Sequence, residues 1–427
     1  MSGFDTMRGL VGVAVILAFA WLASEDRTRF PWRLALGAVA AQAVLVFLLF
    51  AFPATRGVLS LAGLGVDALA GSAQAGTRFV FGFLAGAGGQ PYLVSDPASL
   101  YILAFRVLPV ILVICALSAL LWHWRVLRWL TQGFGFVFQR TMGLRGAPAL
   151  ATAATIFMGQ VEGPIFIRGY LAGLTRSELF LLLTVGMSCV SGSTVVAYAA
   201  ILKGVLPQAA AHVLTASLIS APAGILLART LVPRDAARER VDGFDAASVK
   251  TYESSIDALM RGTADGLQIA LNVAATLLVF VALVAMADRL LALAPPVFGA
   301  PLSVERVLGV VFAPLAWLIG VSWREAPVAG GLLGVKLTLT EFTAFIDFAR
   351  LPTDVLSERT RVILTYALCG FANIASVGIN VAGYSVLVPE RRSEVMGLVW
   401  KAMAAGFLAS CMTAAVVGAL PEGLYRA

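Results

Sequence analysis

Long runs of apolar residues most restrict how this 427-residue chain can fold. About 20 apolar residues in a helix cross the roughly 30 Å hydrocarbon core of a bilayer. Eight runs reach or approach that length: residues 9–24, 34–53, 101–122, 179–202, 209–232, 267–295, 361–388 and 395–420. With 59% hydrophobic residues, 13% charged residues and a mean hydropathy of +0.89, the chain is more apolar than any water-soluble core requires. The sequence predicts an all-α polytopic membrane protein with eight transmembrane helices.

Three further apolar stretches, at 148–174, 304–322 and 326–350, are interrupted by glycine, proline or charge. At membrane depth, a backbone leaves the helical conformation only where protein buries it or where it lines a cavity. We therefore expect hairpins or interfacial helices in these stretches, with re-entrant helical hairpins at 148–174 and about 325–352.

The arginines predict the orientation of the chain in the membrane. Arg27, Arg29 and Arg33 follow the first apolar run, so the loop that holds them is expected in the cytoplasm. Both termini are then expected outside, and the first run is expected to remain as a span because no convincing signal-peptide cleavage site follows it. The net charge of +7 suits this orientation and contact with anionic lipid headgroups, whereas no basic stripe with interleaved aromatic residues indicates a nucleic-acid partner.

The two halves of the chain show a weak internal repeat at an offset of 180 positions. Thr175 and Glu178 are spaced as a capping box before one span, and Leu356-Ser357-Glu358 precedes the equivalent span. Each half has the order span, amphipathic helix, broken hairpin, span with a polar break, span. Because an odd number of crossings separates equivalent points, the second copy is expected to be inverted, as is typical of secondary transporters.

The repeat divides the chain into four expected regions. They are an N-terminal two-helix scaffold region with an outer amphipathic segment (1–100), a first inverted repeat (101–231), a cytoplasmic linker (232–263) and a second inverted repeat (264–427).

Two carboxylates, Glu162 and Glu341, lie inside the predicted hairpins. Placing a carboxylate at bilayer depth costs several kcal/mol of free energy. Such a residue is therefore retained mainly where it lines a solute pathway, binds a ligand or carries a proton. The alternative is a structural ion pair, with Arg168 or Lys336 as the partner.

Other polar groups accompany these carboxylates at the hairpins and at the polar breaks 188–194 and 370–376. They are Gln160, Asn373 and Ser376, with Phe371 as a stacking surface. Carboxylates and carboxamides with little basic charge nearby suit a neutral polyhydroxylated or heterocyclic solute better than an anion.

Four motifs in this order resemble the concentrative nucleoside transporter family, and the resemblance covers essentially the whole chain. They are Gly159-Gln-Val-Glu-Gly-Pro164, the Ser-Gly-Ser that follows Met187, Gly334-Val-Lys336-(x)3-Thr-Glu341-Phe-Thr-Ala344 and Cys369-Gly-Phe-Ala-Asn373. The resemblance implies a homotrimer in the bacterial inner membrane with periplasmic termini, in which a transport domain moves like an elevator. It implies import of nucleosides such as uridine, cytidine or adenosine, with no cofactor.

The resemblance also assigns roles by position. Gln160 and Glu162 would face the nucleobase, whereas Glu341, Asn373 and Ser376 would hold the ribose hydroxyls and Phe371 would line the same pocket. Two other positions are expected to influence which nucleosides are carried: Val161, where the family usually has threonine, and Thr194.

The coupling cation is either H⁺ or Na⁺. Where sodium-coupled members carry Asn and Ser side chains, this chain has Thr155 and Cys189, and a thiol is a poor ligand for a hard cation. The backbone carbonyls near Met158 and Val190 need no particular side chain. We favour proton coupling through Glu162 or Glu341, with sodium coupling as the alternative.

Two other classes of protein would also bury polar groups. An intramembrane enzyme is not expected, because the chain has no His-Glu-x-x-His, no Gly-x-Ser-x-Gly and no catalytic aspartate pair. A passive channel is the second of these classes, and it would show uptake in which the inside solute concentration never exceeds the outside concentration.

The four cysteines show no paired spacing and so indicate neither a disulfide framework nor a metal site.

Overall fold

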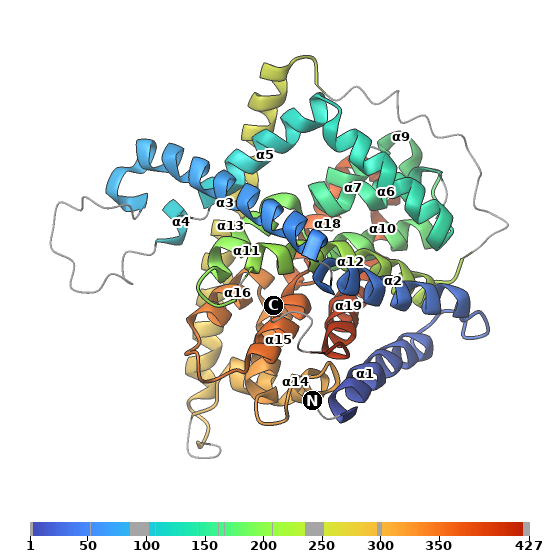
Figure 1. Ribbon diagram of the computed structural model, residues 1–427, viewed down its shortest axis with the longest axis vertical. Coiled ribbons are helices and arrows are strands. Elements are labelled where there is room, and N and C mark those ends of the chain that lie inside the picture. Colours follow the sequence, from blue (N-terminus) through green and yellow to red (C-terminus); the bar gives the residue numbers. More distant parts are fainter. Residues whose placement is uncertain are drawn as a thin grey trace.

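A computed structural model describes residues 3–51, 53–85, 102–106, 108–144, 146–160, 162–165, 167–206, 208–234, 252–296 and 301–421. Within these ranges the regular structure is entirely helical, which confirms the predicted all-α class (Figure 1).

The N-terminal region wraps the outside of the molecule. It consists of α1 (Gly3–Leu22), α2 (Trp32–Ala51), α3 (Pro53–Phe81) and the short η1 (Gly82–Ala85). Helix α1 packs against α19 (Arg392–Gly418), whereas α2 and α3 lie across α12 (Ala209–Leu231). The helical part of the expected amphipathic segment is α3, and residues 86–101 lie outside the described chain.

The two halves of the remaining chain contain helices in a similar order. The first half contains α4 (Leu103–Arg106), α5 (Leu108–His123), α6 (Val126–Met142), α7 (Gly146–Met158), α8 (Glu162–Ile165), α9 (Arg168–Leu171), α10 (Arg176–Ser188), α11 (Gly192–Leu202) and α12. The second half contains α13 (Ser255–Leu291), α14 (Val304–Leu318), α15 (Ala326–Thr338), α16 (Glu341–Arg350), α17 (Glu358–Leu368), α18 (Ile374–Leu387), η4 (Pro389–Arg391) and α19. Each half therefore has a helix broken at a hairpin and a second helix broken near its middle.

Helix lengths and apolarity identify the spans that are continuous. In the described chain, α12 and the η4–α19 segment are each long and apolar enough to cross a membrane. Helices α5 and α6 form a third candidate but are bent by 77° relative to each other, so the predicted span and the amphipathic helix after it meet at a sharp corner. Two other predicted spans are the broken pairs α10–α11 and α17–α18.

The connection between the halves is shorter than its composition suggested. Helix α13 begins at Ser255, where the hydroxyl of Ser254 accepts a hydrogen bond from Asp257 N. It then continues without interruption through residue 264, where the second repeat was expected to start. Residues 255–263, assigned to the linker, are thus the start of α13, and residues 235–251 lie outside the described chain.

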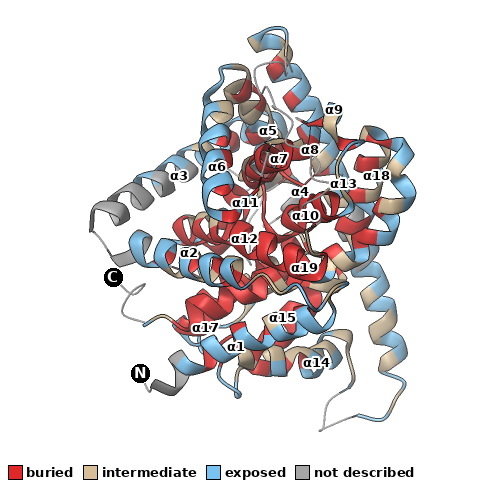
Figure 2. Cartoon of the chain, turned by 90° about the vertical axis from the view of Figure 1, so that its right-hand side faces the viewer, coloured by how far each residue is buried: buried red, intermediate tan, exposed pale blue. Residues whose placement is uncertain are grey.

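The interior is formed by α10, α12 and α19, which contact one another; α10 and α12 are almost wholly buried, and α19 is buried from Ala405 onward apart from the partly buried Leu408 (Figure 2). Many of their inward-facing residues are Ala, Gly, Ser or Thr. Small residues let helix backbones approach closely, which is the usual way for helices to pack in a membrane.

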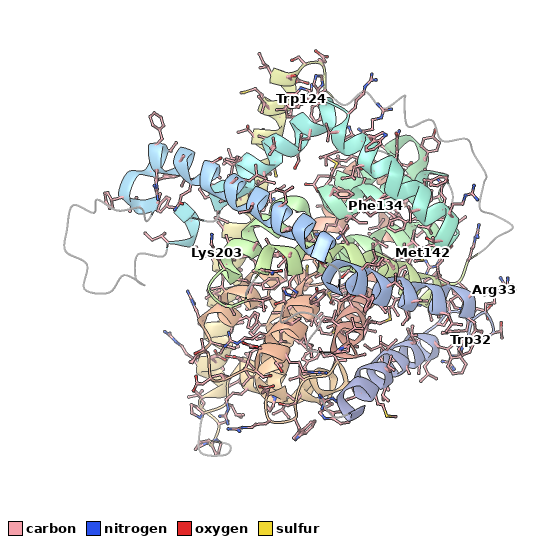
Figure 3. All side chains as sticks on the ribbon, viewed as in Figure 1. Trp32, Arg33, Trp124, Phe134, Met142 and Lys203 are labelled. Atoms are coloured by element: carbon pink, nitrogen blue, oxygen red, sulfur yellow. The ribbon has the colours of Figure 1, made fainter. Side chains whose placement is uncertain are left out.

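Tryptophans and arginines occupy exposed positions at the ends of helices. The side chains of Trp32 and Trp129 are 70% and 78% exposed, and Trp32 and Arg33 extend outward from the start of α2 (Figure 3). Trp124, at the corner between α5 and α6, donates a hydrogen bond from Nε1 to Ser255 Oγ at 3.1 Å. Amphipathic rings and arginines at helix ends are typical of the membrane–water interface.

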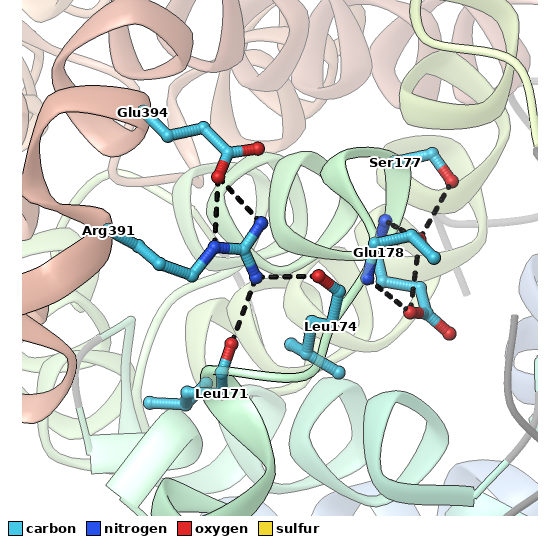
Figure 4. A network of polar contacts seen from close by, with 7 residues as sticks. Leu171, Leu174, Ser177, Glu178, Arg391 and Glu394 are labelled. Carbon is cyan, nitrogen blue, oxygen red and sulfur yellow. Dashed lines mark hydrogen bonds and ion pairs between the residues drawn. The ribbon is translucent and has the colours of Figure 1, made fainter. Parts of the chain in front are cut away.

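Polar contacts fix the starts of the two broken helices. The predicted capping box is confirmed, because Thr175 Oγ1 accepts from Glu178 N while a Glu178 carboxylate oxygen accepts from Thr175 N. Arg391 binds the turn before this helix to the second half of the chain by donating to the carbonyl oxygens of Leu171 and Leu174, at 2.9 and 2.6 Å (Figure 4).

Glu325 plays the corresponding part at the start of α17. Its carboxylate accepts hydrogen bonds from the backbone and hydroxyl of Ser357 and from the hydroxyl of Thr360. Burial disfavours the charged form, but the hydrogen bonds from Thr360, Ser357 and Ser322 are together stronger and hold the pKa of the Glu325 carboxyl group below its usual range.

The contact between α14 and α15 generates a stability prediction. A methyl group added at Gly330 would lie 2.6 Å from the carbonyl oxygen of Gly309, closer than van der Waals contact allows. We expect Gly330→Ala to separate the two helices and to destabilise the protein by about 1–3 kcal/mol, seen as a lower unfolding midpoint in detergent.

Gly397→Ala is the matched control, because an added methyl group there meets nothing within 4 Å in the helical α19. It should leave the midpoint unchanged, or raise it because alanine's helix propensity adds up to about 1 kcal/mol to the free energy of unfolding. Equal midpoints for the two variants would contradict the proposed close approach.

Candidate functional site

The two mid-helix breaks meet in the interior. Helix α10 ends at Cys189 and α11 begins after Ser191, both in extended conformation. Helix α17 ends at Cys369 and α18 begins after Asn373. The backbone N–H of Phe371 donates to the carbonyl oxygen of Cys189 at 3.3 Å, so the polar breaks predicted in the two halves are joined by a main-chain hydrogen bond.

A side chain from α12 satisfies the backbone at the first break. The hydroxyl of Ser217 donates to the carbonyl oxygen of Val190 at 3.0 Å and accepts from its N–H at 3.4 Å. At the second break, a methyl group on Gly370 would lie 2.8 Å from the carbonyl oxygen of Ser188. Glycine is therefore needed there for the two breaks to approach each other.

Glu341 lies at the start of α16, where the second hairpin turns. Its side chain is buried, and Oε1 accepts from the Tyr198 hydroxyl at 2.7 Å while Oε2 accepts from Asn373 Nδ2 at 2.5 Å. Tyr198 belongs to α11 and packs against the rings of Phe342 and Phe345. An ionised carboxylate has about four lone-pair sites, so the side chains of Tyr198 and Asn373 do not use its full capacity.

The hydrogen bonds continue from Asn373 to the first hairpin. Asn373 Oδ1 accepts from the backbone N–H of Ser376 at 2.7 Å, and Ser376 Oγ accepts from Gln160 Nε2 at 3.1 Å. Gln160 Oε1 accepts from Asn380 Nδ2 at 2.9 Å. The structure thus brings together four of the predicted site residues: Gln160, Glu341, Asn373 and Ser376.

Lys336 is fully buried beside this network without an ion pair to Glu341. Its ammonium group donates to the carbonyl oxygen of Ala367 at 2.7 Å and to Ser410 Oγ at 2.6 Å, and it lies over the ring of Phe407. Ala367 is in the last turn of α17, where carbonyl groups lack helical partners and a positive charge is favourable. Lys336 therefore stabilises the break, and Glu341 is not explained as half of a structural ion pair.

Glu162 differs from Glu341 in its surroundings. It begins the short α8 and is half-buried, and its carboxylate lies so close to Gly159 that an added methyl group there would collide with it. Within the described chain it has neither a side-chain hydrogen bond nor an ion pair with Arg168. Val161, predicted to influence base preference, lies outside the described residues.

Two further predicted site residues lie at the breaks but outside the side-chain network. The hydroxyl of Thr194 donates to the carbonyl oxygen of Ser191 at 2.8 Å, in the first turn of α11. The partly buried ring of Phe371 packs against the main core, and its backbone makes the contact between the breaks.

The residues expected near a coupling cation have separate partners. The hydroxyl of Thr155 donates to Ala151 O at 2.8 Å, while the buried Cys189 thiol lies 3.8 Å from the Ser188 hydroxyl. The carbonyl of Val190 accepts from Ser217, and Met158 packs beside Trp122. Among the described residues, no three His, Cys, Asp or Glu side chains converge as metal ligands.

A cavity of about 250 Å³ lies away from these residues. It is lined by Arg29, Pro31, Leu34, Met142, Gly143, Arg229, Pro233 and Arg234, none of which was predicted to bind solute. The network around Glu341 is the stronger candidate site, because its polar groups converge from both predicted hairpins, from the second break and from α11.

Sequence reasoning missed three residues of the site: Tyr198, Ser217 and Asn380. Asn380 carried a usable signal, because it is an amide inside an apolar helix one turn after Ser376. Tyr198 and Ser217 had no comparable signal, since tyrosine and serine are common in helices of this composition.

Comparisons with known proteins agree with this architecture. Family models match in three segments: "Na+ dependent nucleoside transporter N-terminus" over residues 11–84, "Nucleoside recognition" over 104–205 and "Na+ dependent nucleoside transporter C-terminus" over 212–418. The uncharacterized transporter YutK of Bacillus subtilis is 37% identical over 97% of this chain and 99% of its own. The putative nucleoside permease NupX of Escherichia coli is 34% identical over 97% of this chain and 98% of its own.

The solved structures of CNTnw share the fold at 34% sequence identity and cover 97% of both chains. An inward-facing, substrate-bound state aligns with a TM-score of 0.88, and a variant in an outward-facing state aligns with 0.89. The proteins matched in these comparisons are transporters rather than enzymes.

The contact of Ser217 with the first break generates a second stability prediction. Ser217→Ala leaves the buried N–H and carbonyl groups of Val190 without their side-chain partner, which we expect to cost about 1–3 kcal/mol. The variant should unfold at a lower temperature in detergent and show faster amide hydrogen exchange at residues 189–192.

Ser72→Ala is the control, because that exposed hydroxyl bonds only to the Ala68 carbonyl of its own helix. Exchange at 189–192 that matches the unsubstituted protein would show that Ser217 does not hold the break.

Proposed function

The chain belongs to the concentrative nucleoside transporter family, and we propose that it is a secondary active transporter that imports nucleosides by cation symport. The observation that carries this proposal is the hydrogen-bonded set of Glu341, Asn373, Ser376 and Gln160 beside the place where the two breaks meet. These groups are uncharged or acidic, so they suit a neutral, hydroxyl-bearing solute.

The two ends of the network would read different parts of a nucleoside. The remaining acceptor capacity of Glu341 would take the hydrogens of the vicinal ribose hydroxyls, with Asn373 and Ser376 beside them. Gln160 and Glu162 would face the base, Phe371 would line the pocket, and Val161 and Thr194 would influence base preference. Uridine, cytidine and adenosine are the substrates to test first.

Alternating access would follow from movement of the hairpins and broken helices against a scaffold. We propose the division into 1–100, 101–231, 232–263 and 264–427, with hairpins at 148–174 and about 325–352. Related CNTnw structures in inward-facing and outward-facing states support two conformations of this fold. We further propose a homotrimer in the inner membrane, with both termini periplasmic and the arginine-rich loops cytoplasmic.

We propose protons as the coupling ion. A sodium site at Thr155 and Cys189 would be weak, because the Thr155 hydroxyl already donates to the carbonyl oxygen of Ala151 and a thiol is a poor ligand for a hard cation. Glu162, with no side-chain partner in the described chain, is the better proton carrier because the oxygens of Glu341 already hold Tyr198 and Asn373. Sodium coupling is the second candidate, favoured by the sodium dependence in the descriptions of two matching families.

Uptake of uridine and adenosine into proteoliposomes, under separately imposed proton and sodium gradients, tests both the function and the coupling. With one proton per nucleoside, a gradient of one pH unit should drive about tenfold accumulation, because both correspond to about 1.4 kcal/mol. An ionophore that collapses the gradient should abolish this accumulation.

Each of the other outcomes would indicate a different coupling ion, mechanism or activity. Accumulation driven by sodium alone at fixed pH would contradict proton coupling. Uptake that never exceeds the outside concentration would indicate a passive channel, and chemical conversion of the solute in detergent would indicate an enzyme.

Glu341→Gln should reduce uridine uptake at least about 100-fold, because it removes acceptor sites for both ribose hydroxyls and charge-assisted hydrogen bonds contribute about 1.5–3 kcal/mol each. The trimer mass measured in detergent should stay unchanged. Glu390→Gln, at an exposed position, is the matched control. Normal uridine uptake by the Glu341→Gln variant would remove Glu341 from the ribose role.

A further inference from the structure

Asn380 is a fully buried amide on α18 whose Oδ1 accepts no hydrogen bond from the described residues. Leaving such an acceptor unpaired costs about 1–3 kcal/mol, and a leucine of similar size would avoid that cost. A purely structural role therefore explains this residue poorly. The contacts of its other amide atom, Nδ2, indicate a role in orienting a neighbouring side chain.

The orientation of the Asn380 amide is fixed by a backbone group. Its Nδ2 lies 2.9 Å from the carbonyl oxygen of Ser376, and a carbonyl oxygen can only accept hydrogen bonds. The atom facing Ser376 must therefore be the nitrogen. The same nitrogen donates to Gln160 Oε1 at 2.9 Å.

The orientation of the Gln160 carboxamide follows from that of Asn380. Because Oε1 faces the Asn380 nitrogen, Nε2 faces the Ser376 hydroxyl, at 3.1 Å. Each end of the Gln160 amide then has one protein partner, which leaves one N–H and one lone pair for a ligand. The ligand meets this donor and this acceptor in a fixed arrangement.

We infer that Asn380 determines base specificity by fixing which end of the Gln160 carboxamide is the donor and which the acceptor. Asn380 is a positioning residue, since it acts through Gln160. The inference deepens the proposed nucleoside transport and rests on it.

Uridine and cytidine are the pair that distinguishes the two amide orientations. They share the ribose and the pyrimidine ring, but uridine presents N3–H as a donor and O4 as an acceptor, whereas cytidine presents N3 as an acceptor and its 4-amino group as a donor. An amide held in one orientation matches one base edge better than the other, and a reversed amide reverses that preference.

Asn380→Asp should reverse the Gln160 amide. The new carboxyl group offers oxygen where the amide offered N–H, so it accepts from Gln160 Nε2, and the Ser376 hydroxyl then donates to Oε1. If the new group is protonated, its O–H donates to the carbonyl oxygen of Ser376 and the second oxygen still accepts from Gln160. Asn380→Leu removes the constraint altogether.

The test measures KM for uridine, cytidine and 2′-deoxyuridine in proteoliposomes. We expect Asn380→Asp to change the uridine-to-cytidine KM ratio at least tenfold and Asn380→Leu to bring it closer to one. The uridine-to-deoxyuridine ratio should stay within twofold, because the ribose is held at Glu341. Gln139→Glu, the same exchange of amide for acid at an exposed position of α6, should change neither ratio.

Several outcomes would overturn the inference. A uridine-to-cytidine ratio within twofold of the unsubstituted protein in both variants would do so, as would equal changes for all three nucleosides, which indicate a general loss of structure. For a variant that does not transport, the nucleoside-dependent rise of its unfolding midpoint in detergent gives the same ratio from binding. If the unsubstituted protein takes up none of the three nucleosides, the proposed function fails and this inference fails with it.

Discussion

The structure depends on one constraint: backbone groups that leave the helix inside a membrane must find partners within the protein. The breaks at 189–191 and 369–373 meet it by pairing with each other, through Phe371 N and the Cys189 carbonyl, and by pairing with Ser217. Lys336 supplies donors at the end of α17 in the same way. The bond between Phe371 and Cys189 joins the two halves of the chain at their breaks, whereas Ser217 and Lys336 each satisfy backbone groups of their own half.

The polar side chains at the site extend this principle. A continuous path of hydrogen bonds runs from Asn380 through Gln160, Ser376, Asn373 and Glu341 to Tyr198, and so links both predicted hairpins, the second break and α11. Breaking any link would leave a buried group unpaired, at a cost of about 1–3 kcal/mol. This cost favours movement of the hairpins and breaks as a unit, as the proposed elevator mechanism requires.

Much of the architecture could be predicted from the sequence because its causes are local. The stretch 148–174, predicted as a hairpin, overlaps α7–α9, the stretch at about 325–352 contains α15 and α16, and the helix cap at Thr175 forms as expected. Hydropathy, glycines and cap residues influence only a few adjacent positions. Their effects can therefore be predicted without knowing which segments pack together. The start of α13 at Ser255 was missed because charge composition alone does not separate a polar loop from the solvated end of a long helix.

The sequence by itself determined the class of the protein, the places where helices break, and the two carboxylates that a bilayer would otherwise exclude. Only the tertiary structure decided which residues face those carboxylates. Tyr198 reaches Glu341 across 143 positions and Asn380 reaches Gln160 across 220, and no local pattern encodes either distance. It also separated Glu341, which accepts from the side chains of Tyr198 and Asn373, from Glu162, which accepts from no other side chain in the described chain. The physical reason is that a hydrogen bond depends on where two groups meet in space, whereas a helix or a break depends mainly on adjacent residues.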